Sequence, residues 1–220
     1  HAYSSDASKG RDTYRDTHVK VSDDFLATLS SDAETTPTDL PYLRPNKIEP
    51  GKPAVFALLE EDPMEYWLVW GTPKEGGNNH PFRFLEKPSD EEIELELGRD
   101  FTRALNFDKT AEDKPYKCLT WPVYNWVKKR VEVLEITQIS ISRQIVKYAL
   151  QKAYSKNLLD WDFQMEKVNV GGKVKYELMV IPRDEDENDD IQMAKDWKAA
   201  QKAGFDLKRL IVGGDPFKEA

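Results

Sequence analysis

The chain has 220 residues, 32 of them basic and 40 acidic, which gives a formal net charge of −8, and its mean hydropathy is −0.70. This length suits one domain of about 130 to 150 residues with arms, or two small domains. The acidic balance taken alone argues against a nucleic-acid binder, which usually carries a basic field. The single cysteine, Cys118, excludes an internal disulfide and a cysteine-based zinc site.

The charges are unevenly distributed along the chain. Residues 114–183 carry 13 basic and 6 acidic side chains, whereas residues 86–113 carry 4 and 10, and residues 184–220 carry 6 and 10. Segregation of this kind can be functional. An anionic ligand is therefore expected to meet the segment 114–183.

Residues 1–50 are predicted to form an N-terminal arm. They are rich in Ser, Asp and Thr, and four prolines between residues 37 and 50 favour extended backbone. Within the arm, Asp23–Leu29 is predicted to be a short helix.

Alternating apolar residues predict strands at 53–59, 66–72 and 81–85. The second of these strands places Tyr66, Leu68 and Trp70 on one face and Trp67 on the other. An acidic insertion, 86–113, follows the third strand. Ser89 is expected to cap a helix over residues 90–97 there, because acidic residues in a first turn suit the helix dipole.

Residues 116–183 predict a hairpin, a helix and a second hairpin. The strands are 116–126 and 130–136, joined at 127–129, and 160–168 and 173–181, joined around Gly171-Gly172, a strong turn signal. Between them, the helix 138–154 has one apolar stripe, formed by Ile141, Ile145, Tyr148, Ala149 and Ala153. This order is the second half of a small barrel of the OB type.

The expected fold is therefore mainly β with flanking helices: an OB-type barrel of five to six strands over residues 51–183, with one helix between strands three and four. Trp161 and Phe163 are assigned to its core. Residues 184–220 are predicted to form an acidic linker and a C-terminal helix over 191–203, continued by 205–212. The run Asp184–Asp190 is interpreted as a solvated linker rather than a calcium loop, with a DNA mimic in the protein's own groove as an alternative.

The strand 116–126 carries aromatic residues on both faces. Trp121 lies on one face, and Tyr124 and Trp126 lie on the other. Because both faces cannot point into one small core, we expect Tyr124 and Trp126 to be partly exposed. Rings for base stacking beside cations for phosphates are what a single-stranded nucleic acid needs. The predicted nucleic-acid-binding residues are Tyr124, Trp126, Lys128, Lys129 and Arg130, with Tyr66 and Trp70 as further rings and Arg83 and Lys52 on the opposite wall.

The stretch Trp121–Lys152 (WPVYNWVKKRVEVLEITQISISRQIVKYALQK) resembles single-stranded-DNA-binding proteins of tailed bacteriophages. In that family a strand ending in V-x-N-W/Y is followed by a charged hairpin tip, a strand close to R-V-x-I-L-E-I-T-Q, and a helix. Trp161–Pro182 resembles the family's final hairpin, which has a glycine-bearing turn and ends in a proline. The resemblance covers roughly residues 50–183.

The resemblance implies an OB-fold protein that coats single-stranded DNA during replication or recombination of a viral genome, in the host cytoplasm. The acidic insertion 86–113 and the helical C-terminus depart from the family's pattern. Asp215-Pro216-Phe217 resembles the acidic, aromatic motif through which bacterial single-strand binders recruit partner enzymes, so these three residues are the predicted partner-binding motif.

Three functions are weighed. The first is sequence-tolerant binding of single-stranded DNA, without metal, cofactor or turnover. The second is a structural or interaction protein whose barrel is a scaffold for homo-oligomers or partner docking, which the net charge favours. The third is a nuclease using Asp160, Asp162 and Glu132. The chain has no P-loop and no G-x-G-x-x-G or G-x-S-x-G motif, so we expect no enzyme.

Overall fold

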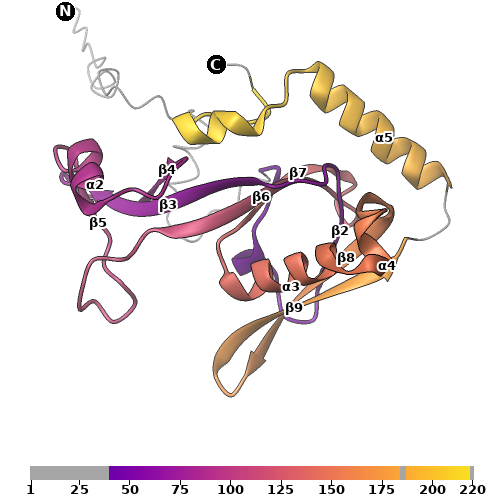
Figure 1. Cartoon of the computed structure of the whole chain (residues 1–220), viewed down its shortest axis with the longest axis horizontal. Helices are drawn as coiled ribbons and strands as arrows, with labels where there is room; N and C mark the ends of the chain where they lie inside the picture. Colours follow the sequence, from indigo (N-terminus) through magenta and orange to yellow (C-terminus); the bar gives the residue numbers. More distant parts are fainter. Residues whose placement is uncertain (1–39, 184–186, 219–220) are drawn as a thin grey trace, which may run out of the picture.

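The computed structural model describes residues 40–183 and 187–218. Its strands are β1 (Tyr42–Leu43), β2 (Ala54–Leu58), β3 (Met64–Pro73), β4 (His80–Phe84), β5 (Phe101–Arg103), β6 (Tyr116–Asn125), β7 (Arg130–Ile136), β8 (Trp161–Val170) and β9 (Lys173–Pro182). The helices are η1 (Pro45–Lys47), α2 (Asp90–Leu97), α3 (Ile139–Leu150), α4 (Lys152–Ser155), η2 (Leu158–Asp160), α5 (Glu187–Lys202) and η3 (Leu207–Val212). In Figure 1, α3 lies on one side of the sheet, and α5 and η3 lie on the other.

The sheet is built around β2, which pairs antiparallel with both β6 and β8. The full path is β1-β7-β6-β2-β8-β9, and β3 pairs with β6, β4 and β5 away from this path. The prediction of a mainly β protein with flanking helices is confirmed. The described strands do not close into the expected barrel of five to six strands, because β7 and β9 do not pair.

The edges of β7 and β9 that face this opening both have hydrogen-bonding partners. β1 lies parallel to β7, with Tyr42 opposite Val133. On β9, the side chain of Gln144 from α3 donates to the carbonyl of Tyr176 and accepts from the amide of Leu178, each at 2.9 Å. The glutamine amide thus satisfies backbone groups that a neighbouring strand would otherwise pair with.

Most predicted elements are present within one or two residues of their expected bounds. The side chain of Ser89 caps α2 by accepting from the amide of Glu92 at 3.2 Å. Gly171 and Gly172 connect β8 to β9 with φ angles of 59° and 78°, the left-handed values that a two-residue hairpin turn requires. Phe163 is fully buried, and Trp161 is partly buried against Tyr154.

Three predicted helices differ from the structure. The C-terminal helix α5 begins at Glu187, four residues before its expected start, so residues 187–190 are helical and not part of the acidic linker predicted there. The helix expected over 138–154 breaks at Gln151, whose ψ of 135° is extended, so Ala153 is exposed while Ile141 and Ile145 are buried. The segment 205–212 does not continue α5, because Gly204, with φ of 93°, follows the end of that helix. Asp206 then starts η3 by accepting from the amide of Lys208. The helix expected at 23–29 lies outside the described residues.

Apolar clusters cover both faces of the sheet. The largest one lies between the sheet and α3, and it includes Phe56, which stacks on Phe163 at 5.6 Å between ring centroids. We call the opposite side of β3, β6 and β7 the outer face, and residues 187–218 the C-terminal extension. On the outer face, Val133 packs with Leu207 and Leu210 of the extension.

The acidic insertion 86–113 folds at the far end of β3. Ile93 and Leu97 of α2 pack there on Val69, with Phe82, Phe84 and Phe101 around them. β5 pairs with the last residues of β3. In Figure 1 this part, with α2, lies at the end of β3 that is farthest from α3.

Candidate nucleic-acid interface

The turn between β6 and β7 presents two lysines to solvent. The side-chain oxygen of Asn125 accepts from the amides of Val127 and Lys128, at 3.0 and 3.2 Å, and Lys129 adopts a left-handed φ of 53°. Asparagine favours such turns because its side chain substitutes for a backbone acceptor. Lys128 and Lys129 are therefore exposed at the tip, as the prediction of phosphate contact requires.

Arg130 does not share this exposure. Its guanidinium is 2.8 Å from the buried carboxylate of Glu132 and donates to the carbonyl of Leu40 at 2.9 Å. Glu132 also accepts from the side chain of Asn125 at 2.6 Å. Arg130 thus neutralises a buried carboxylate and fastens the chain before β1, so the basic triplet divides into two outward lysines and one structural arginine.

Trp126 is half-buried beside the tip. Its indole N–H donates to Asp162 Oδ1 at 2.9 Å, and Arg183 Nε donates to the same oxygen at 3.0 Å. The guanidinium of Arg183 also lies 5.9 Å from the centroid of the Trp126 ring. Burial raises the pKa of Asp162, and its hydrogen bonds with Trp126 and Arg183 oppose that rise. Arg183 was not predicted from the sequence to belong to this site. Its position directly after the last strand is the only feature that could have indicated it.

The expectation that Tyr124 is partly exposed is wrong. The side chain is 1% exposed, and its hydroxyl donates to Asp196 Oδ2 of α5 at 2.7 Å. Burial, and then the hydrogen bond with Asp196, raise the pKa of Tyr124. The ring also packs edge-on against Trp126, with centroids 4.9 Å apart. Tyr124 joins the sheet to the C-terminal extension in this structure, so it offers no face to a base.

Tyr66 is also buried, contrary to expectation. Its hydroxyl contacts Thr120 Oγ1 at 2.7 Å and donates to Glu135. Burial is the main cause of its raised pKa. Trp70 is partly buried beside it and packs on the cluster of Tyr66, Leu68 and Cys118, which Ile211 covers. The outer face is therefore closed over Tyr66 and partly covers Trp70.

Arg83 does not line a groove. Its Nε and Nη2 donate to the two carboxylate oxygens of Glu135, at 3.0 and 3.3 Å. The Arg83 side chain is 10% exposed and that of Glu135 is 22% exposed. This paired, bidentate geometry already satisfies the guanidinium, so the expectation that Arg83 contacts phosphate is not supported by its position.

Lys52 is exposed in the turn before β2, 2.8 Å from Glu49. The tip begins beside this strand, because the amide of Trp126 donates to the carbonyl of Val55 at 2.9 Å. Further along the sheet, Ala54 of β2 pairs with Met165 of β8. The start of β2 thus lies beside Lys52, the 127–129 tip and the β8–β9 hairpin.

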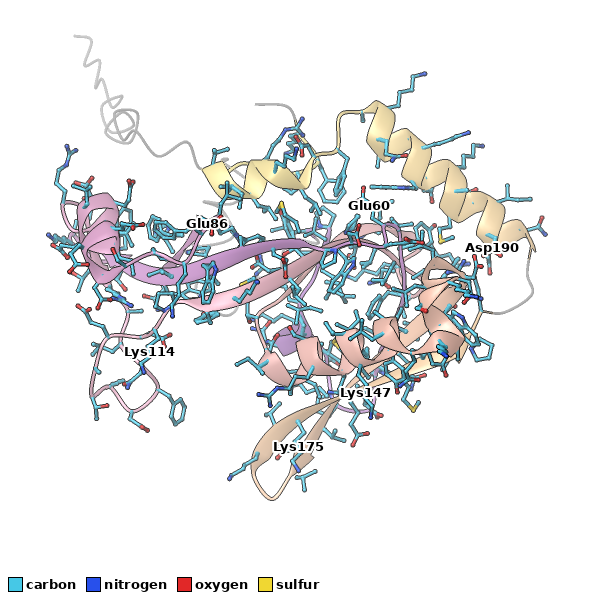
Figure 2. All side chains as sticks on the ribbon, viewed as in Figure 1. Glu60, Glu86, Lys114, Lys147, Lys175 and Asp190 are labelled. Atoms are coloured by element: carbon cyan, nitrogen blue, oxygen red, sulfur yellow. The ribbon has the colours of Figure 1, made fainter. Side chains whose placement is uncertain are left out.

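The turn of the β8–β9 hairpin is also basic, although none of its lysines is among the binding residues predicted from the sequence. Residues 167–175 contain Lys167, Lys173 and Lys175 and no acidic side chain. Figure 2 shows Lys114, Lys147 and Lys175 on the side of α3 and this hairpin, and Glu60, Glu86 and Asp190 on the side of the C-terminal extension. The positions of these six labelled residues follow the charge segregation seen along the sequence.

The predicted partner-binding motif is packed into the fold. The carbonyl of Pro216 accepts from the amide of Asp206 at 2.9 Å and from Arg209 Nη1 at 3.0 Å. Pro216 is buried, and Phe217 packs edge-on against Phe205. Asp215 Oδ1 accepts from the amide of Phe217 at 2.9 Å. Asp215-Pro216-Phe217 thus closes the extension over the outer face and is not a free tail in this structure.

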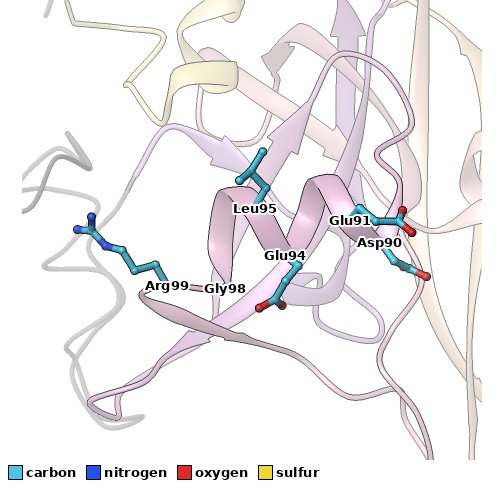
Figure 3. Close-up of a pocket in the computed structure, with 6 residues that line it drawn as sticks. All are labelled: Asp90, Glu91, Glu94, Leu95, Gly98 and Arg99. Atoms are coloured by element: carbon cyan, nitrogen blue, oxygen red, sulfur yellow. The ribbon is translucent and has the colours of Figure 1, made fainter.

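A hollow of about 770 Å³ lies beside α2, away from all of these residues. Figure 3 shows that the carboxylate of Glu94 points away from those of Asp90 and Glu91. Asp90 is also paired with Arg103 at 2.7 Å. Among the described residues, no three His, Cys, Asp or Glu side chains are grouped to hold a metal ion.

None of the helices in the described ranges combines the length and apolar character needed to cross a membrane.

Comparison of the chain with protein-family models, with curated proteins and with solved structures found no match.

Proposed function

We propose that this protein binds single-stranded DNA with little sequence preference, at the surface around the start of β2. The observation that carries the proposal is the Asn125-anchored turn, which holds Lys128 and Lys129 exposed beside the half-buried indole of Trp126. Lys52 and the basic β8–β9 turn flank this place. The arrangement offers cations for phosphates and one ring for a base, and it requires no turnover.

The order of strand pairing supports the proposal. A first strand flanked by the second and fourth, with a helix between the third and fourth, is the arrangement expected of the OB fold, and here β2, β6, β7, α3, β8 and β9 follow it. OB folds bind oligonucleotides with the face of strands two and three and with two loops, one of which joins strands four and five. We infer that the corresponding parts of this chain are the outer face and the β8–β9 turn. The resemblance of residues 121–152 to phage single-strand binders points the same way.

The proposed site is narrower than the sequence suggests. The C-terminal extension covers the outer face, and Tyr66, Tyr124, Arg83 and Arg130 are engaged in internal contacts. We therefore assign stacking to Trp126 and phosphate contacts to Lys128 and Lys129, with Lys52 and the hairpin lysines as an extension of the path.

The experiment is a titration of the full chain with oligo-dT, followed by tryptophan fluorescence at several salt concentrations. For single strands, log K falls with log salt by about 0.7 for each neutralised phosphate. K128E/K129E should weaken binding and reduce this slope by about 1.4 if each lysine meets one phosphate. K152E/K156E, which makes the same charge change on exposed residues around α4, is the control. Equal affinities for the two double variants would refute the assignment.

A second function has one specific observation in its favour. The extension packs Leu207 and Leu210 onto the face that an OB fold uses for nucleic acid, which suits a scaffold or interaction protein with no such ligand. In that case oligo-dT leaves tryptophan fluorescence unchanged. The mass of the protein in solution, measured by light scattering, then shows whether it forms homo-oligomers.

A further inference from the structure

Helix α3 is apolar on two sides. One stripe, with Ile141 and Ile145, is buried against the sheet. On the other side Ile139, Val146 and Leu150 are 60%, 41% and 79% exposed, an unusual exposure for three large apolar residues on one helix. With Arg143 they are spaced by three or four residues, so they form a second continuous stripe.

This second stripe borders a groove of about 490 Å³. It is lined by Glu65, Lys117, Leu119, Ile139, Ser142, Arg143, Val146, Lys147 and Leu150. The groove thus runs between α3 and the neighbouring parts of β3 and β6. Its apolar floor spans the 12 residues of helix from Ile139 to Leu150, whose ends lie about 16 Å apart at a rise of 1.5 Å per residue.

The charge of the groove is positive. Lys117, Arg143 and Lys147 face one acidic residue, Glu65, which lies 3.4 Å from Lys117. Arg143 and Lys147 form no ion pair with any side chain in residues 40–183 or 187–218. A segment that fits this groove is therefore acidic and has apolar residues at helical spacing.

The chain contains a segment of this chemistry outside the described residues. Between Val21 and Leu29, the apolar residues Val21, Phe25 and Leu29 are spaced by four, and Asp23 and Asp24 lie between them. No lysine or arginine occurs from residue 21 to residue 43. Ten residues separate this segment from Leu40, enough to span up to about 36 Å.

We propose that residues 21–29 bind the α3 groove. Nine residues at the helical rise of 1.5 Å per residue span about 13 Å, which fits within the apolar floor. Phe25 and Leu29 would contact Val146 and Leu150, and Asp23 and Asp24 would face Arg143 and Lys147. This inference is independent of nucleic-acid binding, because it uses none of the residues assigned to the 127–129 tip.

The first test places a photoreactive benzophenone amino acid at position 25 of the full chain and maps the crosslinked peptides by mass spectrometry. Crosslinks to residues 139–150 or to Leu119 are expected. The mass of the crosslinked product tells whether the segment binds its own chain or a second copy, and either result supports the proposal. Crosslinks confined to other places, or none, would overturn it.

A charge-reversal series tests the recognition itself. R143E/K147E should lower the crosslink yield at least tenfold, and adding D23K/D24K should restore most of it. K152E/K156E has the same change in charge outside the groove and should leave the yield unchanged. Circular dichroism checks that each variant is folded. An unchanged yield in a folded R143E/K147E variant would refute the proposed occupant.

Discussion

Replacing Arg83 with methionine is expected to destabilise the fold without changing the affinity for oligo-dT. The guanidinium makes two hydrogen bonds to Glu135, which also accepts from the buried hydroxyl of Tyr66. Removing one partner of a buried ion pair costs about 3 to 5 kcal/mol, because the other charge stays buried without compensation. Glu135 is 22% exposed, and solvent screens part of that charge, so the expected loss is about 3 kcal/mol or less.

The companion variant R83M/E135Q separates charge from packing. It removes both charges, so its loss of stability should be smaller than that of R83M by about 1 to 2 kcal/mol. Urea denaturation followed by tryptophan fluorescence gives the free energy of unfolding of each variant. R99A is the control, since Arg99 forms an exposed pair with Asp100, and its change should stay within about 0.5 kcal/mol.

The opposite result for R83M would refute this reasoning. If R83M keeps its stability but loses affinity for oligo-dT, then Arg83 contacts phosphate, and its pairing with Glu135 does not hold the fold together. That result would return Arg83 to the binding surface where the sequence first placed it.

Four further results are expected. L210A should lower the free energy of unfolding by about 2 to 5 kcal/mol, whereas V212A, on an exposed residue of the same helix, should change it by about 0.5 kcal/mol or less; similar losses would mean that η3 does not pack as described. Q144A removes two hydrogen bonds to the edge of β9 and should cost about 1 to 3 kcal/mol in urea denaturation, while an unchanged midpoint would show that the edge needs no cover. Burial raises the pKa of the Cys118 thiol from 9.0 to about 12. The unfolded chain therefore loses this proton at a lower pH than the folded protein does. The contribution of this thiol makes the free energy of unfolding fall as the pH rises from 9 to 12. At pH 8, a disulfide reagent should modify Cys118 only after denaturation, and rapid reaction of the folded protein would contradict its burial.

Local patterns predicted most of the elements. The period-two alternation in 116–136 and 160–181, the Gly171-Gly172 turn and the Ser89 cap each depend on neighbouring residues alone, and each is present in the structure. The break at Gln151 was not predictable from the apolar stripe, because Tyr154 packs on Tyr148 and Trp161 only after the chain changes direction there. The apolar stripe of the helix carries no signal for these ring contacts.

The candidate site was predicted less well, for one physical reason. Tyr124 and Tyr66 would be exposed if the protein had a single core, but the C-terminal extension gives the outer face a cover of its own. Nothing local in β6 indicates that Asp196, 72 residues later, accepts from the Tyr124 hydroxyl. The exposure of Lys128 and Lys129 was predictable, because a short turn between two strands leaves its own side chains in solvent.

The cover of the outer face has a consequence for how the chain is made. Leu210 follows Val133 by 77 residues, which a ribosome adds in about 4 to 15 s at 5 to 20 residues per second. During that interval the strands around Val133 and Tyr66 lack the segment that shields them from water. A polypeptide that ends before residue 207 leaves this apolar surface exposed to solvent, so we expect it to bind chaperones or to aggregate.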